Sequence, residues 1–122
     1  MVAREFGLDA AQAQSAREAA ERILRGEGAW VWDSADLVWQ GSEVELAHEG
    51  RLMRLDRLVK RRDGTWWVLD FKSHASPQTQ ADLLLQLQAY ARAVAVLHPG
   101  QPVKAAFLTA QGNCIEVALA AT

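Results

Sequence analysis

At 122 residues, the chain is long enough to bury a hydrophobic core and short enough to form one domain. Half of its residues are hydrophobic and 23% are charged, which excludes a disordered chain. The formal net charge of −2 excludes attraction of nucleic acid by the protein as a whole, so such binding would require a local basic patch.

The single cysteine, Cys114, excludes an internal disulfide and a cysteine-based zinc site, and it favours a reducing compartment. The three histidines lack paired metal-ligand spacing. There is no apolar run of about 18 residues and no hydrophobic signal core, so we expect no membrane segment and a cytoplasmic location.

The first predicted element is a helix over residues 9–25, capped by Asp9 and stopped by Gly26. Its expected apolar stripe consists of Ala16, Ala20, Ile23 and Leu24. Residues 26–41, "GEGAWVWDSADLVWQG", hold three of the five tryptophans between turn residues. This stretch predicts an irregular packing segment with short extended pieces.

Three strands are predicted next, over residues 43–48, 51–60 and 66–73. Glu49-Gly50 suits a two-residue hairpin turn, and Arg62-Asp63-Gly64 suits a three-residue loop with glycine in the left-handed conformation. The three strands should form an antiparallel meander.

A loop around Pro77 leads into a second predicted helix over residues 79–97. The "HPGQP" stretch ends this helix. Two more strands, over residues 103–110 and 114–119, are joined by a turn. The predicted order is helix, three strands, helix, two strands.

Two opposite charges near the end of the third strand share one face of the sheet. Side chains alternate along a strand, so Asp70 and Lys72 lie on the same face as Trp66. A three-residue loop pairs Arg61 with Thr65, and counting back along both strands places Asp56 opposite Asp70. The same count through the first hairpin places Glu43 opposite Asp56.

Three acids would then form a row across three strands, although a one-residue slip in either hairpin would send one acid to the other face. Opposed like charges repel, because their Cβ atoms are about 4.5–5.5 Å apart. Magnesium or manganese bound by the carboxylates would offset this repulsion. The alternative is a lattice of surface ion pairs with Arg54, Arg57 and Lys72, and spacing alone does not decide between the two.

Six basic residues fall between residues 51 and 62, and they form either a nucleic-acid patch or a solvated hairpin with charged edges. They are Arg51, Arg54, Arg57, Lys60, Arg61 and Arg62. The tryptophans are either base-stacking platforms or core residues, and core packing is the more common use. The candidate DNA contacts are Arg51, Arg54, Arg57 and Trp66.

The stretches "RLDRLVKRRDGTWWVLDFKS" and "LLLQLQAYARAVAVLHPGQPVKAAFLT" resemble the PD-(D/E)XK nuclease domain of RecB/AddA-type (UvrD/Rep-like) helicase–nucleases. Asp56 matches the aspartate of the first family motif, and Asp70-Phe71-Lys72 matches the D-x-K motif. Gln86 and Tyr90 match the Q-x-x-x-Y motif of the following helix. The resemblance covers roughly residues 42–119.

This resemblance implies a restriction-endonuclease-like core, an α/β fold with a mixed five-stranded sheet flanked by helices, in agreement with the predicted element order. It also implies a Mg²⁺- or Mn²⁺-dependent deoxyribonuclease of exonuclease type. Asp56, Asp70 and the Phe71 carbonyl would bind the metal. Lys72 would orient the attacking water or stabilise charge on the phosphate, and Gln86 and Tyr90 would contact DNA or hold the catalytic strand.

The chain departs from the family pattern at two places. Met53 stands where a small residue is usual, three positions before Asp56. An additional ligand is sometimes supplied by the N-terminal helix, where Glu18 and Glu21 are equivalent candidates. Glu43 is the preferred accessory acid, from the register count.

Residues 1–122 are predicted to form a single nuclease-like domain. The related domains follow a helicase motor, yet this sequence has no GxxxxGK[ST] loop. The chain is therefore either a C-terminal fragment of a larger helicase–nuclease, which we favour, or a free-standing relative. The expected partners are DNA and a helicase motor in cis or in trans, in recombination or repair. The alternative function is an inactive nuclease-like domain for DNA-end binding or docking.

Overall fold

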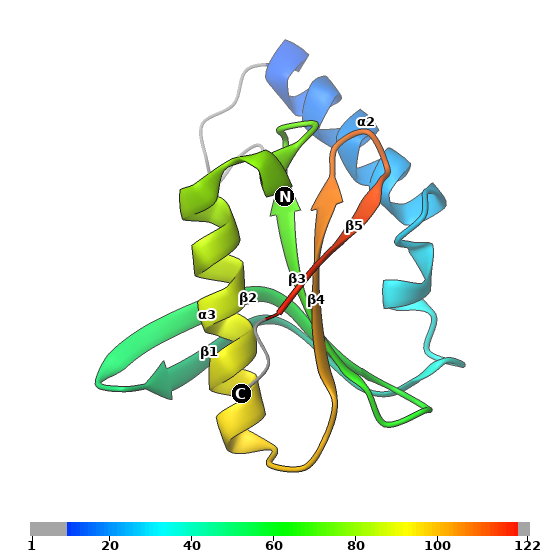
Figure 1. Cartoon of the computed structure of the whole chain (residues 1–122). Helices are drawn as coiled ribbons and strands as arrows, with labels where there is room; N and C mark the ends of the chain where they lie inside the picture. The colour runs from blue at the N-terminus through cyan, green and yellow to red at the C-terminus, as the bar shows by residue number, and fades with distance from the viewer. Residues whose placement is uncertain (1–9, 120–122) are drawn as a thin grey trace.

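The computed structural model of the chain describes residues 10–119, which form a five-stranded sheet with helices on its two sides (Figure 1). The helical elements are α2 (Ala10–Arg25), η1 (Ala29–Trp32), η2 (Pro77–Thr79) and α3 (Ala81–Leu97), where η denotes a 3₁₀ turn. The strands are β1 (Leu37–His48), β2 (Arg51–Arg61), β3 (Trp66–Lys72), β4 (Val103–Thr109) and β5 (Cys114–Val117). The element order agrees with the prediction.

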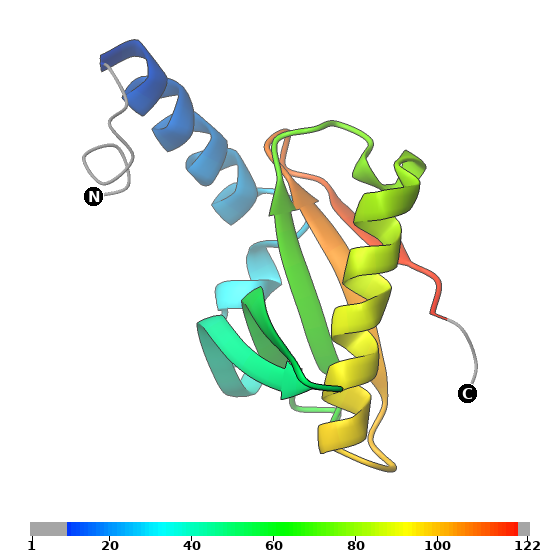
Figure 2. The ribbon, with the colours of Figure 1, turned by 90° about the vertical axis from the view of Figure 1, so that its left-hand side faces the viewer.

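The sheet is mixed, with strand order β1-β2-β3-β4-β5. Strands β3 and β4 are parallel and are connected through α3, whereas the other neighbouring strands are antiparallel. Figure 2 shows α3 along one face, with η1 on the other side and α2 leading away from the sheet. This arrangement confirms the predicted α/β class and the mixed five-stranded sheet. None of the helices within residues 10–119 is long and apolar enough to cross a membrane.

Both predicted turns of the meander are confirmed. Glu49 and Gly50 have φ values of 50° and 75°, and Gly64 has a φ of 91°. Such a two-residue turn with positive φ matches the twist of the strands that it joins. His48 pairs with Arg51, as the predicted register requires.

Strand β1 is longer than the sequence predicted, since it begins at Leu37 rather than at residue 43. Leu37 is buried, but Val38 and Trp39 are 57% and 44% exposed because β1 is the edge strand. A glycine at position 41 leaves room for the Trp39 ring, which would lie 2.9 Å from an added Cβ. These exposed apolar residues and the glycine hide the alternation that normally marks a strand.

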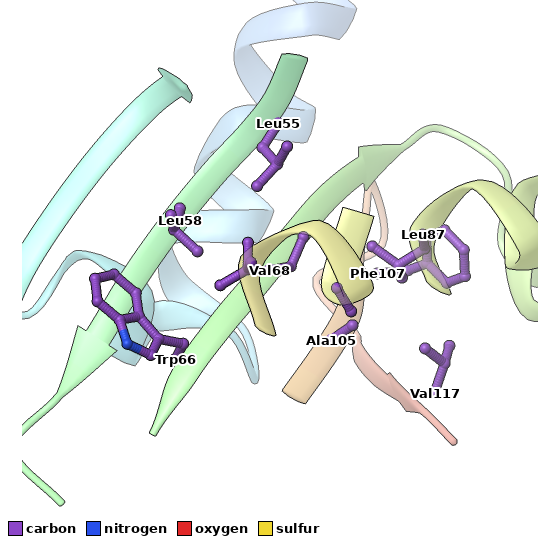
Figure 3. Packing of buried hydrophobic residues seen from close by; sticks show 10 residues of the cluster. Leu55, Leu58, Trp66, Val68, Leu87, Ala105, Phe107 and Val117 are labelled. Carbon is purple, nitrogen blue, oxygen red and sulfur yellow. The ribbon is translucent and has the colours of Figure 1, made fainter. Parts of the chain in front are cut away.

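The core has two layers, one on each face of the sheet. On the α3 side, Trp66 and Val68 of β3 pack with Leu87 and Phe107 (Figure 3). On the opposite side, Trp67 and Leu69 pack against the η1 segment. Strand β3 is buried on both faces, which explains its continuous apolar run.

Helix α2 contributes little to this core, and the predicted stripe was only partly right. Ala16 and Ile23 are half-buried, but Ala20 and Leu24 are exposed. The reason is that α2 meets the body through its last turn, where Arg22 Nε donates a hydrogen bond to the Ala110 carbonyl at 2.6 Å. The predicted cap, Asp9, lies outside the described residues.

Gly112→Ala should destabilise the protein more than Gly50→Ala. Gly50 has open space around its α-carbon, so alanine there meets only the cost of a positive φ, about 1 kcal/mol. At Gly112, φ is +88° and an added Cβ would lie 2.8 Å from the Arg22 carbonyl oxygen, so we expect a loss of about 2–4 kcal/mol. Urea unfolding of both variants measures the difference, and equal losses would contradict the close packing of α2 on this turn.

Candidate active site

Asp56 and Asp70 meet where the ladder between β2 and β3 ends. The last backbone pair is Arg57 with Leu69, and the next position in this register brings Asp56 opposite Asp70. There the Asp56 side chain acts in place of a backbone partner, because its Oδ2 accepts a hydrogen bond from the Phe71 N–H at 2.8 Å. The Asp56 carboxyl group is close enough to Asp70 to raise the pKa of that residue. The predicted pairing of these two acids is confirmed.

Asp70 is the buried member of the pair, with 5% of its surface exposed. Burial raises the pKa of its carboxyl group to about 6, and the neighbouring Asp56 carboxyl group adds to this shift. Lys72 acts in the opposite direction, since its Nζ lies 2.9 Å from Asp70 Oδ2. That contact lacks hydrogen-bond geometry, and Oδ2 is a buried oxygen without a hydrogen-bond partner among the described residues.

The predicted third acid, Glu43, does not join the pair. The register of β1 with β2 places Glu43 across from Asp56, but its φ of 52° is left-handed, and the ladder skips this position. Its carboxylate is 72% exposed and pairs with Arg54 at 3.0 Å. Within residues 10–119, no three acidic, histidine or cysteine side chains gather as metal ligands. The predicted row of three acids is therefore a pair, because a left-handed residue breaks the alternation of side chains along the strand.

The pair has the donor chemistry of a hard divalent cation. Mg²⁺ is usually held by one or two carboxylates, with water and phosphate oxygens completing its coordination. Asp70 supplies a buried carboxylate oxygen that forms an ion pair with Lys72, and Asp56 supplies a second carboxyl group beside it. A cation would stabilise both charges in a place where burial disfavours them. The residues present therefore fit the expected metal.

A groove of about 540 Å³ lies between the start of β2 and helix α3. It is lined by Arg51, Leu52, Met53 and Arg54 on β2 and by Asp82, Leu85, Gln86, Ala89 and Tyr90 on α3. Burial raises the pKa of the Tyr90 phenol, and the negative charges of Asp70 and Asp56 raise it further. The structure thus brings the predicted Gln86 and Tyr90 into one groove with Arg51 and Arg54.

Two predicted DNA contacts, Arg57 and Trp66, are buried instead. Arg57 is 4% exposed and points to the face opposite the acids, where it bonds to the Val31 carbonyl. Trp66 is 6% exposed, stacks on His98 at a ring distance of 4.2 Å, and donates from its indole to Gln101. These two residues cannot meet DNA without leaving the core, so their prediction as DNA contacts was wrong.

The six basic residues predicted as one cluster therefore lie in different surroundings. Arg51 and Arg54 are exposed in the groove. Arg61 forms an ion pair with Asp36 at 2.6 Å, and Arg62 donates a hydrogen bond to the Ala35 carbonyl. Neither a continuous nucleic-acid patch nor a fully solvated hairpin describes these residues, because the second half of β2 is anchored to the segment that precedes β1.

The two acids of α2 lie away from the site, whereas an aromatic neighbour of Phe71 carries no signal in the sequence. Glu18 and Glu21, the two equivalent helix candidates, line a separate cavity of about 310 Å³ with Arg22 and Arg25. Sequence reasoning missed Trp32, whose ring stacks on Phe71 at 5.8 Å. No local pattern connects residues 32 and 71, so only the folded structure reveals this contact.

The site consists of the Asp56–Asp70 pair and of Lys72, two positions after Asp70, on a mixed sheet. Together these features define an α/β domain of nuclease-like design. The family model of the PD-(D/E)XK nuclease superfamily matches residues 2–118. The chain belongs to this superfamily, and the predicted restriction-endonuclease-like core is confirmed.

Comparison with curated proteins finds no match. Among solved structures, the crystal structure of SSO0001 is similar to 93% of this chain, with 14% sequence identity and a TM-score of 0.41. The match covers 53% of that chain, so the present chain spans about half its length.

The pKa of Asp70 predicts a pH-dependent stability. Because this pKa is about 6 in the folded protein and ordinarily 3.8, the folded state binds more protons between these values, and stability falls as the pH rises through them. Asp70→Asn removes the buried charge. In EDTA at pH 8 it should be more stable than the wild type by about 1–3 kcal/mol, and the difference should vanish near pH 4. Urea titrations across this pH range measure the difference, and parallel curves would contradict the raised pKa.

Proposed function

We propose that the chain is a metal-dependent DNA nuclease domain that hydrolyses phosphodiester bonds. The observation that carries this proposal is the buried Asp70 carboxylate, beside Asp56 on one side and Lys72 on the other. Membership of the PD-(D/E)XK nuclease superfamily supports the same reading. Asp56 and Asp70 would hold Mg²⁺ or Mn²⁺, and the Phe71 carbonyl remains the predicted third protein ligand.

The cation, when bound, supplies Lewis-acid stabilisation of the phosphate charge and lowers the pKa of a water molecule. Lys72 is suited to orient the attacking water or to neutralise a phosphate oxygen, because its ammonium group is held beside Asp70. The Phe71 N–H holds Asp56 in the orientation that faces Asp70. Burial of Asp70 makes its ionisation depend on a nearby positive charge, which couples the carboxylate to the metal.

DNA would approach through the groove between β2 and α3. Arg51 and Arg54 supply cations for phosphate contacts, and Gln86 supplies an amide. Arg54 is paired with Glu43, but both side chains are mostly exposed, so a phosphate group could replace the carboxylate at little cost. Tyr90 lines this groove, and the charges of both acids act on its phenol, so it would contact the strand next to the reacting phosphate.

The finer assignment is a cytoplasmic exonuclease of recombination or repair that works with a RecB/AddA-type helicase motor. Its support is the order of the motifs around Asp56, Asp70 and Gln86. The motor would be supplied in cis or in trans, since the sequence contains no GxxxxGK[ST] phosphate-binding loop. Residues 1–122 would then form the nuclease domain of the larger assembly.

A second candidate is an inactive nuclease-like domain that binds DNA ends or docks in a repair complex. Two observations favour it. Only two acids meet at the site within the described residues, and Met53, which lines the groove, stands where a small residue is usual. DNA binding without cleavage, unchanged by Asp70→Ala and Lys72→Ala, would select this candidate.

Calorimetric titration with Mn²⁺ and a DNA degradation assay test the proposed activity together. The wild type should bind Mn²⁺ and degrade DNA in its presence, whereas Asp70→Ala should lose both because the buried ligand is gone. Glu116→Ala is the control, since Glu116 is an exposed acid on β5, far along the sheet from β2. Absence of Mn²⁺ binding by the wild type would refute the metal site. Binding without cleavage of single-stranded or duplex DNA would favour the second candidate.

The groove is tested by DNA affinity in EDTA, where cleavage is prevented. The double variant Arg51→Ala/Arg54→Ala should bind DNA more weakly, and its salt dependence should fall by about one unit of slope for each arginine that touches a phosphate in the wild type. Arg92→Ala is the matched control, because Arg92 is exposed on α3 but does not line the groove. Equal weakening in both variants would indicate general charge attraction rather than a defined path for DNA.

A further inference from the structure

A cluster on the face of the sheet opposite the acids contacts the peptide that holds them. The ring of Phe71, next to Asp70 in the chain, stacks on Trp32 with ring centres 5.8 Å apart and planes inclined by 20°. The backbone N–H of the same residue donates to Asp56 Oδ2 at 2.8 Å. Phe71 therefore connects the η1 segment on one face to the acid pair on the other.

Trp32 is itself held by a buried cation. The Arg57 guanidinium lies 5.2 Å from the centre of the Trp32 ring and is 4% exposed. It donates to the Val31 carbonyl from Nε at 3.2 Å and from Nη2 at 2.9 Å, to Ser42 Oγ at 2.8 Å, and to Gln40 Oε1 at 2.6 Å. None of the ion pairs in the described part of the chain involves Arg57. Burial lowers the pKa of this guanidinium.

The cost of burying an unpaired cation indicates a specific role for this arrangement. Arg57 is adjacent to Asp56 in β2 and bonds to the carbonyl that precedes Trp32. It therefore fixes η1 relative to the strand that carries one acid, while Trp32 fixes the residue that follows the other acid. The Phe71 side chain, near the end of β3, is 36% exposed even with Trp32 beside it, and Trp32 is its one ring partner within residues 10–119.

We propose that Trp32, clamped by Arg57, is a positioning residue for the acid pair. It holds the Phe71 peptide from the opposite face of the sheet, so that the N–H orients the Asp56 carboxylate toward Asp70. The consequence for metal affinity rests on the proposed function, whereas the effect on the Phe71 peptide does not. Residues that orient ligands from outside the site commonly change metal affinity by about 10–100-fold.

The chain contains a matched control for Trp32. Trp30 lies in the same 3₁₀ turn, is also half-buried, and is also covered by an arginine, since Arg61 lies 4.3 Å from its ring centre. Its ring partner is Trp67 in the core, at 5.1 Å. The two tryptophans thus share the 3₁₀ turn, partial burial and an arginine neighbour, and they differ in which aromatic ring they contact.

The test measures hydrogen exchange of the Phe71 amide in EDTA and Mn²⁺ affinity by calorimetry. Trp32→Leu should speed Phe71 exchange and weaken Mn²⁺ binding, each by about tenfold, whereas Trp32→Phe should restore both. Trp30→Leu should change neither. The Val68 amide in the same samples reports any general loss of stability, and Phe71→Leu removes the stacking from the exposed side if Trp32→Leu does not fold.

Each outcome bears on the proposal. Wild-type exchange at Phe71 in Trp32→Leu, or an equal effect in Trp30→Leu, would overturn it. Faster Phe71 exchange with unchanged Mn²⁺ affinity would also overturn the proposal that Trp32 positions the acid pair. If the wild type binds no Mn²⁺, the proposed function fails, and Phe71 exchange alone then decides whether Trp32 positions the peptide.

Discussion

Two carboxyl groups held side by side at the end of a strand ladder are the constraint around which the rest of this protein is arranged. A regular ladder would have continued past Arg57 and Leu69, but the backbone pairing stops there, and the Asp56 side chain accepts the Phe71 N–H instead. Burial and mutual repulsion disfavour two negative charges at this place, as the raised pKa of Asp70 shows. Lys72 offsets part of that cost, and a divalent cation would offset more of it.

The two faces of the sheet serve this pair in different ways. On the α3 face, a groove contains Arg51, Arg54 and Tyr90, and the charges of both acids act on the Tyr90 phenol. On the other face, Arg57 and Trp32 support the backbone beneath them. Arginines that are close together in the sequence therefore lie in different surroundings, since Arg51 and Arg54 line the groove and Arg57 is buried against η1.

The separation of these roles explains why membership of the superfamily does not by itself establish activity. A nuclease needs the acids, the lysine and an open path for DNA together, and a binding domain needs only the path. In this chain the acids and the lysine lie close to one another, while Met53 is one of the residues that line the groove. Catalysis therefore depends on the two acids and the lysine, whereas DNA binding depends on the residues that line the groove.

The sequence by itself determined the order of elements, both hairpin turns and the pairing of Asp56 with Asp70. These features depend on short-range rules, namely turn residues with positive φ, a side-chain period of two, and loop lengths that set the register. They hold because every step of the count lies within one meander.

Only the tertiary structure decided where Glu43, Arg57, Trp66 and Trp32 lie. The left-handed backbone of Glu43 itself takes its side chain out of the acid row. A left-handed residue that is not glycine cannot be predicted from composition or from the period of the side chains. The burial of Arg57 and Trp66 depends on segments distant in the chain, namely η1 and the end of α3. Packing of distant segments determines which charged and aromatic side chains are buried, because burial depends on the elements that cover a strand and not on the residues of the strand alone.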